Sequence, residues 1–371
     1  MTPRILIIGG YGAFGARAAE RLARTGDHEL IIAGRNGTEA RAFAAELAAK
    51  SGCTVTAATL DATAASAQAL RPLGAAVVIN ASGPFQAQDY TLARAAISAG
   101  MHYLDLADAR AFVGGIGILD APAKAAGVLV LSGASTVPAV ATAVVDHLAP
   151  QFARLDQLTY GLSPGNAYDP GPATTASILG GLGQPFTTLA DGTMQTIHGW
   201  DDCHRHTFPV LGRRWMARCD VPDLDTMPAR FPTLRDVRFY AGVEIGLFHL
   251  SLAGLAKARR WRLLPDPTPL TRPLLWAKRQ LGFLGTDDGG MFVSLDGRGP
   301  DGQPKRINWH LIARCNHGPY IPTLAAVVLA RKLARGELVA TGAGPCVGFV
   351  TLDDLLAEVA DLDIKATMAA T

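Results

Sequence analysis

The sequence predicts an α/β protein with two domains: an N-terminal doubly wound parallel sheet and a second, mixed α+β domain, with C-terminal helices returning to the first. Its 371 residues exceed the roughly 250–300 at which a single hydrophobic core usually stops growing. Short aliphatic runs alternate with helical patterns up to residue 132, as in parallel βα units. From residue 154 this alternation gives way to short apolar runs separated by SPGN, DPGP and DG turns. We therefore expect domains at 1–132 and 133–318, and C-terminal helices packing on the first domain over 319–371.

The first predicted strand and helix enclose a glycine cluster. Residues 4–8, RILII, are typical of a central strand buried on both faces, and residues 13–24 repeat apolar and alanine positions at helical spacing. A glycine cluster in this position is the fingerprint of a dinucleotide-binding turn. Gly10 would permit the tight turn, Gly12 would let a pyrophosphate approach, and Gly15 would let the helix pack on the strand. The first N–H groups of the helix would face the phosphates. The candidate cofactor-binding residues of this turn are Gly10, Gly12, Ala13, Phe14 and Gly15.

The alternation of strands and helices continues through the first domain. Each strand is a short apolar run, and each helix is a longer stretch with alanine and leucine at helical spacing. Together they predict a Rossmann sheet. The further strands are expected at 29–33, 54–57, 76–80, 103–106 and 128–131, and the helices at 38–49, 64–73 and 90–99.

The end of the second strand favours NADP over NAD. An NAD site places an acidic residue about 20 residues after the glycines to hold the ribose hydroxyls. The chain reads AGRN here, so Gly34 leaves space where the carboxylate would stand and Arg35 can meet a 2'-phosphate. Asn36 belongs to the same candidate turn. Thr38 is interpreted first as the N-cap of the next helix and second as a phosphate ligand.

The end of the fourth strand should pass beside the nicotinamide end of the cofactor. In a doubly wound sheet the ligand lies outside the carboxyl ends of the strands, where the strand order reverses. The fourth strand ends in NASGPF. Asn80, Ser82, Gly83 and Pro84 are therefore candidate cofactor-binding residues.

The fifth strand, HYLDLAD, supplies the candidate catalytic residues. Asp105 is the first candidate to orient substrate or relay a proton, and His102 is the second. Alternate residues of a strand point to opposite faces, so these two are not expected to share a side. Asp105 and Asp108 have the alternative role of caps or turn formers.

The combined motifs resemble the NADP-binding domain of the saccharopine dehydrogenase-like family. The order GGYGAFG, AGRN, VVINASGPF and AGMHYLDLAD follows that family across residues 1–132, and residues 132–148 resemble its crossing into a second domain. Family members usually carry Gly-Glu shortly after the YxDL run, whereas this chain has ADAR. The resemblance implies hydride transfer between NADP(H) and a carbon atom, in the best-known members a C=N centre of an amino-acid adduct. Some relatives act on lipidic material or associate with it.

The second domain is expected to hold a hairpin of 291–295 with 306–312, which could cover a substrate pocket. A helix is predicted over 321–335, and Thr351 with Asp354 predicts a capping box for the last helix. Asp202, His204 and His206 would share one side of a strand, but we favour a solvated polar face and expect no metal. Other, weaker candidates for ligand contact are Tyr160, Asn166, Arg213, Arg214, Trp215 and His310.

Residues 239–256 form a long apolar stretch containing Glu244 and followed by the basic run KARRWR. We interpret the stretch first as a buried core helix, second as a protein or dimer interface, and third as a helix lying at a membrane surface. A membrane surface is therefore the least favoured partner, while a homo-oligomer, such as a dimer, is expected.

Composition bears on the partners and the cellular location of the protein. A formal net charge of +2 without blocks of like charge argues against a nucleic-acid partner. Five scattered cysteines predict reduced thiols and a cytoplasmic protein, and an apolar strand beginning at residue 4 leaves no room for a signal peptide.

The leading function is NADP(H)-dependent hydride transfer at a C=N or CH–NH centre of a small amino-acid-like substrate. One alternative is reduction of a bulky apolar C=C or C=O compound, at a membrane surface in one version. The other is a non-catalytic nucleotide-binding scaffold.

Overall fold

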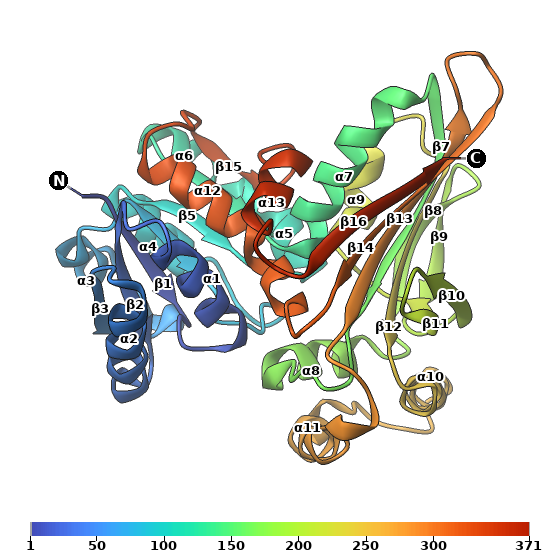
Figure 1. Ribbon diagram of the computed structural model, residues 1–371, viewed down its shortest axis with the longest axis horizontal. Helices are drawn as coiled ribbons and strands as arrows, with labels where there is room; N and C mark the ends of the chain where they lie inside the picture. Colours follow the sequence, from blue (N-terminus) through green and yellow to red (C-terminus); the bar gives the residue numbers. More distant parts are fainter. Residues whose placement is uncertain (1, 371) are drawn as a thin grey trace. The chain divides into compact units, whose positions relative to one another are not determined.

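The computed structural model describes residues 2–370, which form two compact units, each built from two separate stretches of chain. The first unit contains residues 2–140 and 319–358, and the second contains 141–318 and 359–370. Figure 1 shows one large sheet in each unit, sheet A in the first and sheet B in the second. The predicted fold class is confirmed: a doubly wound parallel sheet and a second, mixed α+β unit.

The division of the chain differs from the expected one at two points. The first crossing between units lies at residue 140 instead of 132. The assignment of 359–370 to helices on the first domain is wrong, because Ile364–Ala370 is strand β16 of sheet B. Its partner is Pro304–Ala313, the strand β14, which it meets in antiparallel register. The apolar pattern of this last segment is weak, so its long-range partner decides its structure.

Sheet A has seven parallel strands in the order β15-β6-β5-β4-β1-β2-β3. The order reverses direction between β1 and β4, which is the point where doubly wound sheets bind ligands. Six strands lie close to the predicted runs, and most of them are short aliphatic segments. The seventh, β15, comes from the C-terminal part of the chain and was not predicted. The strands are β1 Arg4–Ile8, β2 Glu29–Gly34, β3 Val55–Thr59, β4 Val77–Asn80, β5 His102–Asp105, β6 Leu129–Ser132 and β15 Gly342–Pro345.

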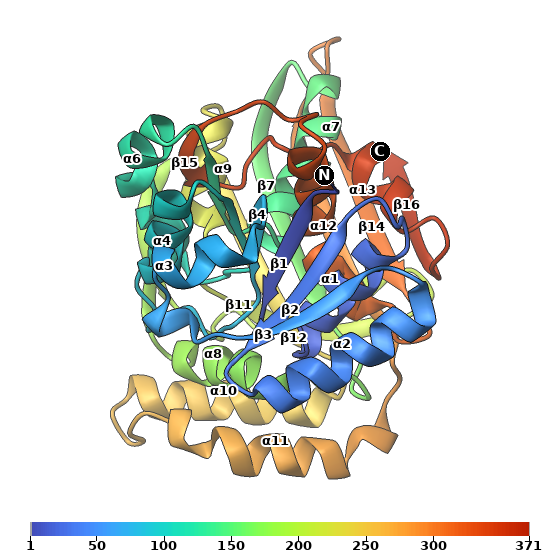
Figure 2. The same cartoon turned by 90° about the vertical axis from the view of Figure 1, so that its left-hand side faces the viewer.

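Helices cover both faces of sheet A. Leu6, Ile8 and Val78 point to the face covered by α4, where they join Leu92 and Ile97 in one buried cluster. Figure 2 shows α1 and α12 on the opposite face, where the two helices contact each other. The helices of this unit are α1 Ala13–Ala23, α2 Gly37–Ser51, α3 Ala67–Leu70, α4 Thr91–Ala99, α5 Arg110–Gly115, α6 Asp120–Ala125, α12 Leu324–Ala334 and α13 Leu352–Glu358.

Two helix caps test the sequence interpretation. The N-cap of α2 is Asn36, whose Oδ1 accepts from the backbone N–H groups of Thr38 at 3.1 Å and Glu39 at 3.3 Å. The prediction that Thr38 is this cap is wrong, because the helix begins one residue before it. The predicted capping box of α13 is confirmed, since Asp354 N donates to Thr351 Oγ1 at 3.1 Å and Thr351 N donates to Asp354 Oδ2 at 3.2 Å.

A buried ion cluster joins α1, α12 and α13, and we call it the C-terminal clamp. It consists of Arg21, Arg331 and Glu358. The Arg21 Nε donates to Glu358 Oε1 at 2.8 Å, with both side chains 7% exposed. Arg331 donates to Glu358 Oε2 and to the Arg21 carbonyl oxygen. These charge-assisted bonds join α12 and α13, which come late in the sequence, to α1, the first helix.

Sheet B has seven strands in the order β10-β11-β12-β7-β13-β14-β16. The pair β7 and β12 is parallel and the other neighbours are antiparallel, so the predicted mixed sheet is confirmed. The predicted hairpin is β13 with β14. A separate two-stranded sheet joins β8 to β9. The strands are β7 Arg154–Ser163, β8 Pro185–Ala190, β9 Thr193–His198, β10 His204–Phe208, β11 Gly212–Arg218, β12 Asp236–Val243, β13 Gly289–Arg298 and β14 Pro304–Ala313.

The apolar stretch at 239–256 is not one helix. Its first five residues end β12, and α10 begins at Gly246. In β12, Val237 and Phe239 are buried and Arg238 between them is partly exposed. This alternation with a period of two residues is typical of a strand and not of a helix. Within residues 2–370, no helix is long and apolar enough to cross a membrane. The helices of the second unit are α7 Ala141–Leu148, α8 Gly171–Gly181, α9 Asp223–Arg230, α10 Gly246–Arg260 and α11 Thr271–Gln280.

Candidate functional site

The glycine turn between β1 and α1 is closed by backbone contacts. The N–H of Gly9 donates to the Ala33 carbonyl at 2.8 Å, and the N–H of Gly12 donates to the Gly9 carbonyl at 2.9 Å. A Cβ added at Gly15 would lie 2.1 Å from the Gly9 oxygen, and one added at Gly10 would lie 2.9 Å from the Ile7 oxygen. Glycine at both positions is therefore required by close packing, as the sequence indicates.

The amino end of α1 has the properties of an anion site. No side chain caps this end of the helix, and its N-cap, Gly12, is exposed. The helix dipole and the first N–H groups favour negative charge at such an end. The first residues, Ala13 and Phe14, thus lie where the sequence predicts them, at the start of the helix beside the glycine turn.

Gly9 is a residue of the turn that sequence reasoning missed. It has φ +76°, and a Cβ there would lie 2.9 Å from the Ala81 carbonyl carbon. A side chain would therefore push the glycine turn away from the loop that follows β4. The doubled glycine at the end of β1 is the signal that could have revealed it.

The turn from β2 to α2 is held by Tyr11. The Tyr11 hydroxyl accepts from the Asn36 N–H at 3.0 Å. A Cβ at Gly34 would lie 2.5 Å from the Tyr11 ring, so this glycine makes room for an aromatic ring. The sequence interpretation explained Gly34 by the missing carboxylate alone. The glycine turn and the AGRN turn are thus joined through one side chain.

Arg35 extends from this turn into solvent. It makes no hydrogen bond or ion pair with any residue of 2–370. On the next turn of α2, Arg41 donates to Thr38 Oγ1 at 3.3 Å. Asp61 lies in the neighbouring loop, and its pKa is lowered mainly by hydrogen bonds from Thr63, with a smaller effect of the Arg35 charge. The arrangement offers a cation and a hydroxyl to an anionic group.

The loop after β4 is anchored by a buried amide. Asn80 is 1% exposed, and its Oδ1 accepts from Ser82 N at 3.1 Å and Ser82 Oγ at 2.5 Å. Its Nδ2 donates to the Tyr103 hydroxyl at 3.1 Å. Ser82 and Gly83 remain partly exposed and Pro84 is exposed. Asn80 therefore holds the loop from below, while Ser82, Gly83 and Pro84 form its accessible surface.

Asp105 is buried at the carboxyl end of β5. Its side chain is fully covered, and Oδ1 accepts from Gly133 N at 2.8 Å, Ser132 Oγ at 2.9 Å and Ala107 N at 3.0 Å. Burial raises the pKa of Asp105 to about 6, against the lowering effect of these hydrogen bonds. The contacts favour a role in holding the turn after β6. Asp108, three residues later, is the exposed acid of this segment and accepts from Gln86 Nε2 at 3.4 Å.

His102 lies at the amino end of β5, the end opposite to Asp105. Its Nδ1 accepts from the Leu129 backbone N–H at 2.9 Å, and burial lowers its pKa. Cofactors bind at the carboxyl ends of parallel strands. The structure thus does not bring the two candidate catalytic residues together, and its geometry gives His102 a contact between strands.

In the second unit, several of the residues singled out in the sequence have structural roles, whereas Arg213 is exposed. Tyr160 is fully buried. The buried Arg214 donates to the carbonyls of Ser163, Pro164 and Asp288, and Asn166 N donates to Glu244 Oε2 at 2.7 Å. These contacts fix the loops at the ends of β7 and β13.

Asp202, His204 and His206, the residues considered and not favoured as a metal face, do not form one group. Asp202 precedes β10 and accepts from the Tyr240 hydroxyl at 2.6 Å, whereas His206 Nε2 lies 3.4 Å from His310 Nε2. His206 also stacks on Phe292, with ring centroids 3.7 Å apart. No group of three His, Cys, Asp or Glu residues in the described chain could hold a metal ion.

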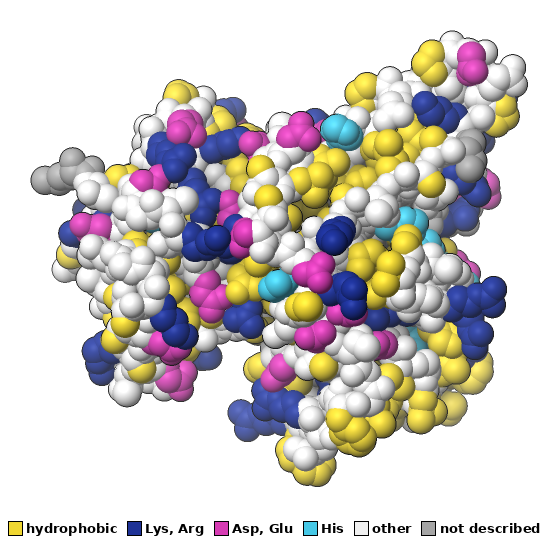
Figure 3. Space-filling model, viewed as in Figure 1, with side chains coloured by type: hydrophobic (Ala, Val, Ile, Leu, Met, Phe, Trp, Pro, Cys, Tyr) yellow, Lys and Arg dark blue, Asp and Glu magenta, His cyan; other side chains and the backbone are white. Residues whose placement is uncertain are grey.

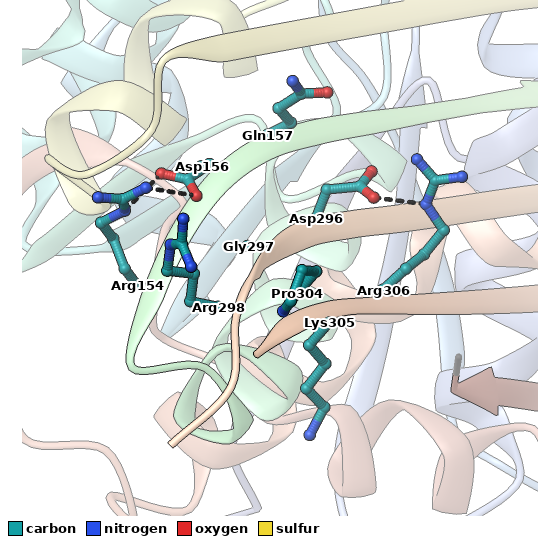
Figure 4. Close-up of a pocket in the computed structure, with 9 residues that line it drawn as sticks. All are labelled: Arg154, Asp156, Gln157, Asp296, Gly297, Arg298, Pro304, Lys305 and Arg306. Carbon is teal, nitrogen blue, oxygen red and sulfur yellow. Dashed lines mark hydrogen bonds and ion pairs between the residues drawn. The ribbon is translucent and has the colours of Figure 1, made fainter. Parts of the chain in front are cut away.

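A cavity of about 570 Å³ lies at the ends of β7, β13 and β14 in the second unit. Figure 4 shows two ion pairs within it, Arg154 with Asp156 and Arg306 with Asp296. Its other cations donate to carbonyl oxygens: Arg298 to Gly302 and Lys305 to Gln151. Because each cation already has a partner, the cavity offers no vacant anion site.

Comparison with known proteins agrees with this geometry. A family model, the saccharopine dehydrogenase NADP binding domain, matches residues 5–131. No curated protein matches the chain. A solved structure of saccharopine dehydrogenase (L-Glu forming) from Saccharomyces cerevisiae is similar over 99% of this chain and 100% of its own, with 13% identity and a TM-score of 0.71.

Other solved structures are similar over a smaller part. A short-chain dehydrogenase from Sphingobium yanoikuyae in complex with NADPH covers 35% of this chain and 71% of its own, with 23% identity and a TM-score of 0.27. A bulky-bulky ketone specific alcohol dehydrogenase from Comamonas testosteroni covers 28% of this chain and 55% of its own, with 23% identity and a TM-score of 0.22. Residues 5–131 therefore match the saccharopine dehydrogenase NADP binding domain, and the chain shares its fold with the yeast enzyme.

Proposed function

We propose that the protein is an NADP(H)-dependent oxidoreductase that transfers a hydride to or from a C=N or CH–NH centre of a small amino-acid-like substrate. The observation that carries the proposal is Arg35, an unpaired cation at the end of β2 beside an uncapped helix end and a glycine turn. Bound NADP would supply the hydride chemistry, and the chain would bind and orient it.

Each part of the carboxyl edge of sheet A has a separate binding task in this proposal. The first N–H groups of α1 receive the pyrophosphate, because Gly9, Gly10, Gly12 and Gly15 leave the backbone uncovered. Arg35 takes the 2'-phosphate, with the Thr38 hydroxyl nearby. Carbonyl and amide groups of Ser82 and Gly83 flank the nicotinamide.

Asp105 acts in this proposal as a positioning residue. Its Oδ1 fixes Ser132 and Gly133, which form the end of β6 next to the cofactor edge. The adjacent β4 loop is fixed in the same way by Asn80. Two buried polar side chains thus set the shape of the edge without contacting solvent.

The substrate class is supported by the overall fold, since the similar yeast protein is named for an amino-acid product. A second candidate is reduction of a bulky apolar C=C or C=O compound. The apolar side chains exposed on α10 and α11, such as Leu247 and Trp276, favour this alternative because they would attract apolar material.

The test is a fluorescence titration of the full chain with NADPH and with NADH. Arg35→Ala should lose NADPH affinity while its weak NADH affinity stays unchanged. Arg94→Ala, an exposed arginine on α4, is the matched control. Equal binding of both nucleotides, or no effect of the Arg35 substitution, would contradict the proposal.

A substrate panel then separates the reactions. Imines formed from amino acids and keto acids, bulky ketones and enoyl compounds are mixed with enzyme and NADPH, and the loss of absorbance at the reduced nicotinamide band is followed. Oxidation with imines supports the leading function, and oxidation with the apolar compounds supports the second. NADPH that stays reduced with every compound would indicate a binding scaffold.

A further inference from the structure

Two helices of the second unit and the segment that joins them expose many large apolar side chains. We call residues 246–284, which contain α10 and α11, the apolar hairpin. In Figure 3, apolar side chains cover the lower edge of the second unit, where Figure 1 shows α11. Among them Trp261 is 67% exposed, Trp276 is 65% exposed and Phe283 is 79% exposed. The exposed large apolar residues of the hairpin are Leu247, Leu250, Trp261, Leu263, Leu270, Leu274, Trp276, Phe283 and Leu284.

Helix α10 carries large apolar side chains on its outer face as well as its inner face. Its fully buried positions are His249, Ala253 and Ala256, and Leu252 and Leu255 pack partly buried beside them. Leu247 and Leu250, in contrast, face solvent. A helix of a water-exposed protein normally turns its larger apolar residues inward. Large apolar side chains exposed together in this way are typical of an interaction surface.

The charge of the hairpin identifies the kind of partner. The segment has one acidic residue, Asp266, against seven basic residues. Within the described chain, Lys257, Arg262 and Arg272 make no ion pair, and all three are exposed. Apolar and tryptophan side chains among basic residues are typical of segments that lie in the headgroup region of a bilayer. The basic residues are Lys257, Arg259, Arg260, Arg262, Arg272, Lys278 and Arg279.

The same charge argues against a second copy of this chain. A two-fold symmetric interface places a surface patch against itself, so the positive charges of the two hairpins would face each other. Like charges brought together disfavour association. An anionic partner has no such penalty.

We propose that the apolar hairpin docks on the surface of an anionic phospholipid bilayer. Trp261, Trp276 and Phe283 insert among the headgroups, and Lys257, Arg262 and Arg272 contact the lipid phosphates. The hairpin lies in the interface and does not span the bilayer. This docking is separate from the proposed cofactor site, because it uses residues of the second unit only.

The experiment is vesicle flotation of the full chain with phosphatidylglycerol–phosphatidylcholine vesicles and with pure phosphatidylcholine vesicles. We expect binding to the anionic vesicles that weakens with added salt. The triple variant K257E/R262E/R272E should lower the partition coefficient by roughly a hundredfold, since each basic residue near an anionic surface contributes about fivefold. Trp261→Ser with Trp276→Ser should also lower it, and should do so at high salt as well.

The controls separate docking from folding and from self-association. Val339→Ser alters an apolar residue that is 91% exposed in the first unit, and should leave vesicle binding unchanged. Circular dichroism and NADPH titration of each variant report whether it is folded. Light scattering after gel filtration reports the oligomeric state. Failure of the folded wild-type chain to float with anionic vesicles would overturn the proposal. So would tryptophan variants that dissociate an oligomer while vesicle binding persists.

Discussion

Arginine side chains occur in two different settings in the first unit, paired with a carboxylate in the C-terminal clamp and unpaired in the AGRN turn. In the C-terminal clamp, Arg21 and Arg331 are joined to Glu358 and removed from water. In the AGRN turn, Arg35 has no carboxylate partner and is exposed. A guanidinium group that already has its anion holds the fold, whereas one left open is available for a ligand. The partner, more than the residue type, separates a structural arginine from a binding one.

The largest expected effect comes from breaking the clamp. Glu358→Gln should lower the free energy of unfolding by about 3–5 kcal/mol, because two buried guanidinium groups lose their anion. NADPH affinity of the folded protein should stay unchanged. Urea unfolding measures the first quantity and fluorescence titration the second. Glu337→Gln, which removes an exposed partner of Arg335, is the control and should change stability little. A small loss with Glu358→Gln would mean that the clamp does not hold the fold.

A buried carboxylate without a cation should behave differently from Glu358. The pKa of Asp105 rises from 3.8 to about 6 on folding, so the folded protein binds more protons than the unfolded chain between these values. Stability from this group is present below pH 3.8 and is lost as pH rises through 6, by about 3 kcal/mol in total.

The measurement is urea unfolding of wild type and Asp105→Asn at several pH values from 4 to 7. The wild type should lose stability relative to the variant as pH rises across this window. Parallel curves for the two proteins would show that Asp105 does not titrate in the folded state as described.

Removing the Arg35 side chain should lower the affinity for NADPH and leave the free energy of unfolding unchanged. Arg35→Ala should weaken NADPH binding by about 10- to 100-fold, the loss of charge-assisted hydrogen bonds to a phosphate. Urea unfolding without ligand should match the wild type. If stability falls as well, Arg35 belongs with the structural arginines and the contrast between the clusters fails.

The smallest effect is expected at the residue that positions the AGRN turn. Tyr11→Phe removes one hydrogen bond to the Asn36 N–H while keeping the ring against Gly34. NADPH affinity should fall by a few-fold, since one neutral hydrogen bond contributes about 1 kcal/mol. NADH affinity is the internal control and should change less. An equal fall for both nucleotides would show that Tyr11 supports the whole cofactor and not the 2'-phosphate turn.

The parts of the fold that could be predicted are set by their own short sequences, whereas the others depend on partners far away in the sequence. Strands such as Arg4–Ile8 and Val77–Asn80 were predictable because buried parallel strands are short aliphatic runs. Strand β15, with the sequence GAGP, has no such pattern and exists because β6 offers a free edge. The stretch 239–256 misled because an apolar run has no visible period where a strand passes into a helix.

The candidate site shows the same division. The glycines and Arg35 could be proposed as binding residues from spacing, since each is set by a short local motif. Tyr11 could not, because its contacts with Gly34 and Asn36 depend on the two turns meeting in space. His102 was misplaced for a related reason. Its position at the amino end of β5 is known only when the strand's limits are known.

The interleaved path of the chain has a consequence for how the protein is made. During synthesis, residues 2–140 leave the ribosome long before 319–358, which supply α12 and β15 to the same unit. Helix α12 is buried along most of its length, so the nascent sheet would present an uncovered apolar face in the interval. Sheet B of the second unit is likewise incomplete until β16 has been synthesised and can pair with β14. Neither unit can be completed until residues 319–370 have been made, so a chain interrupted before them would be a client for chaperones and proteases.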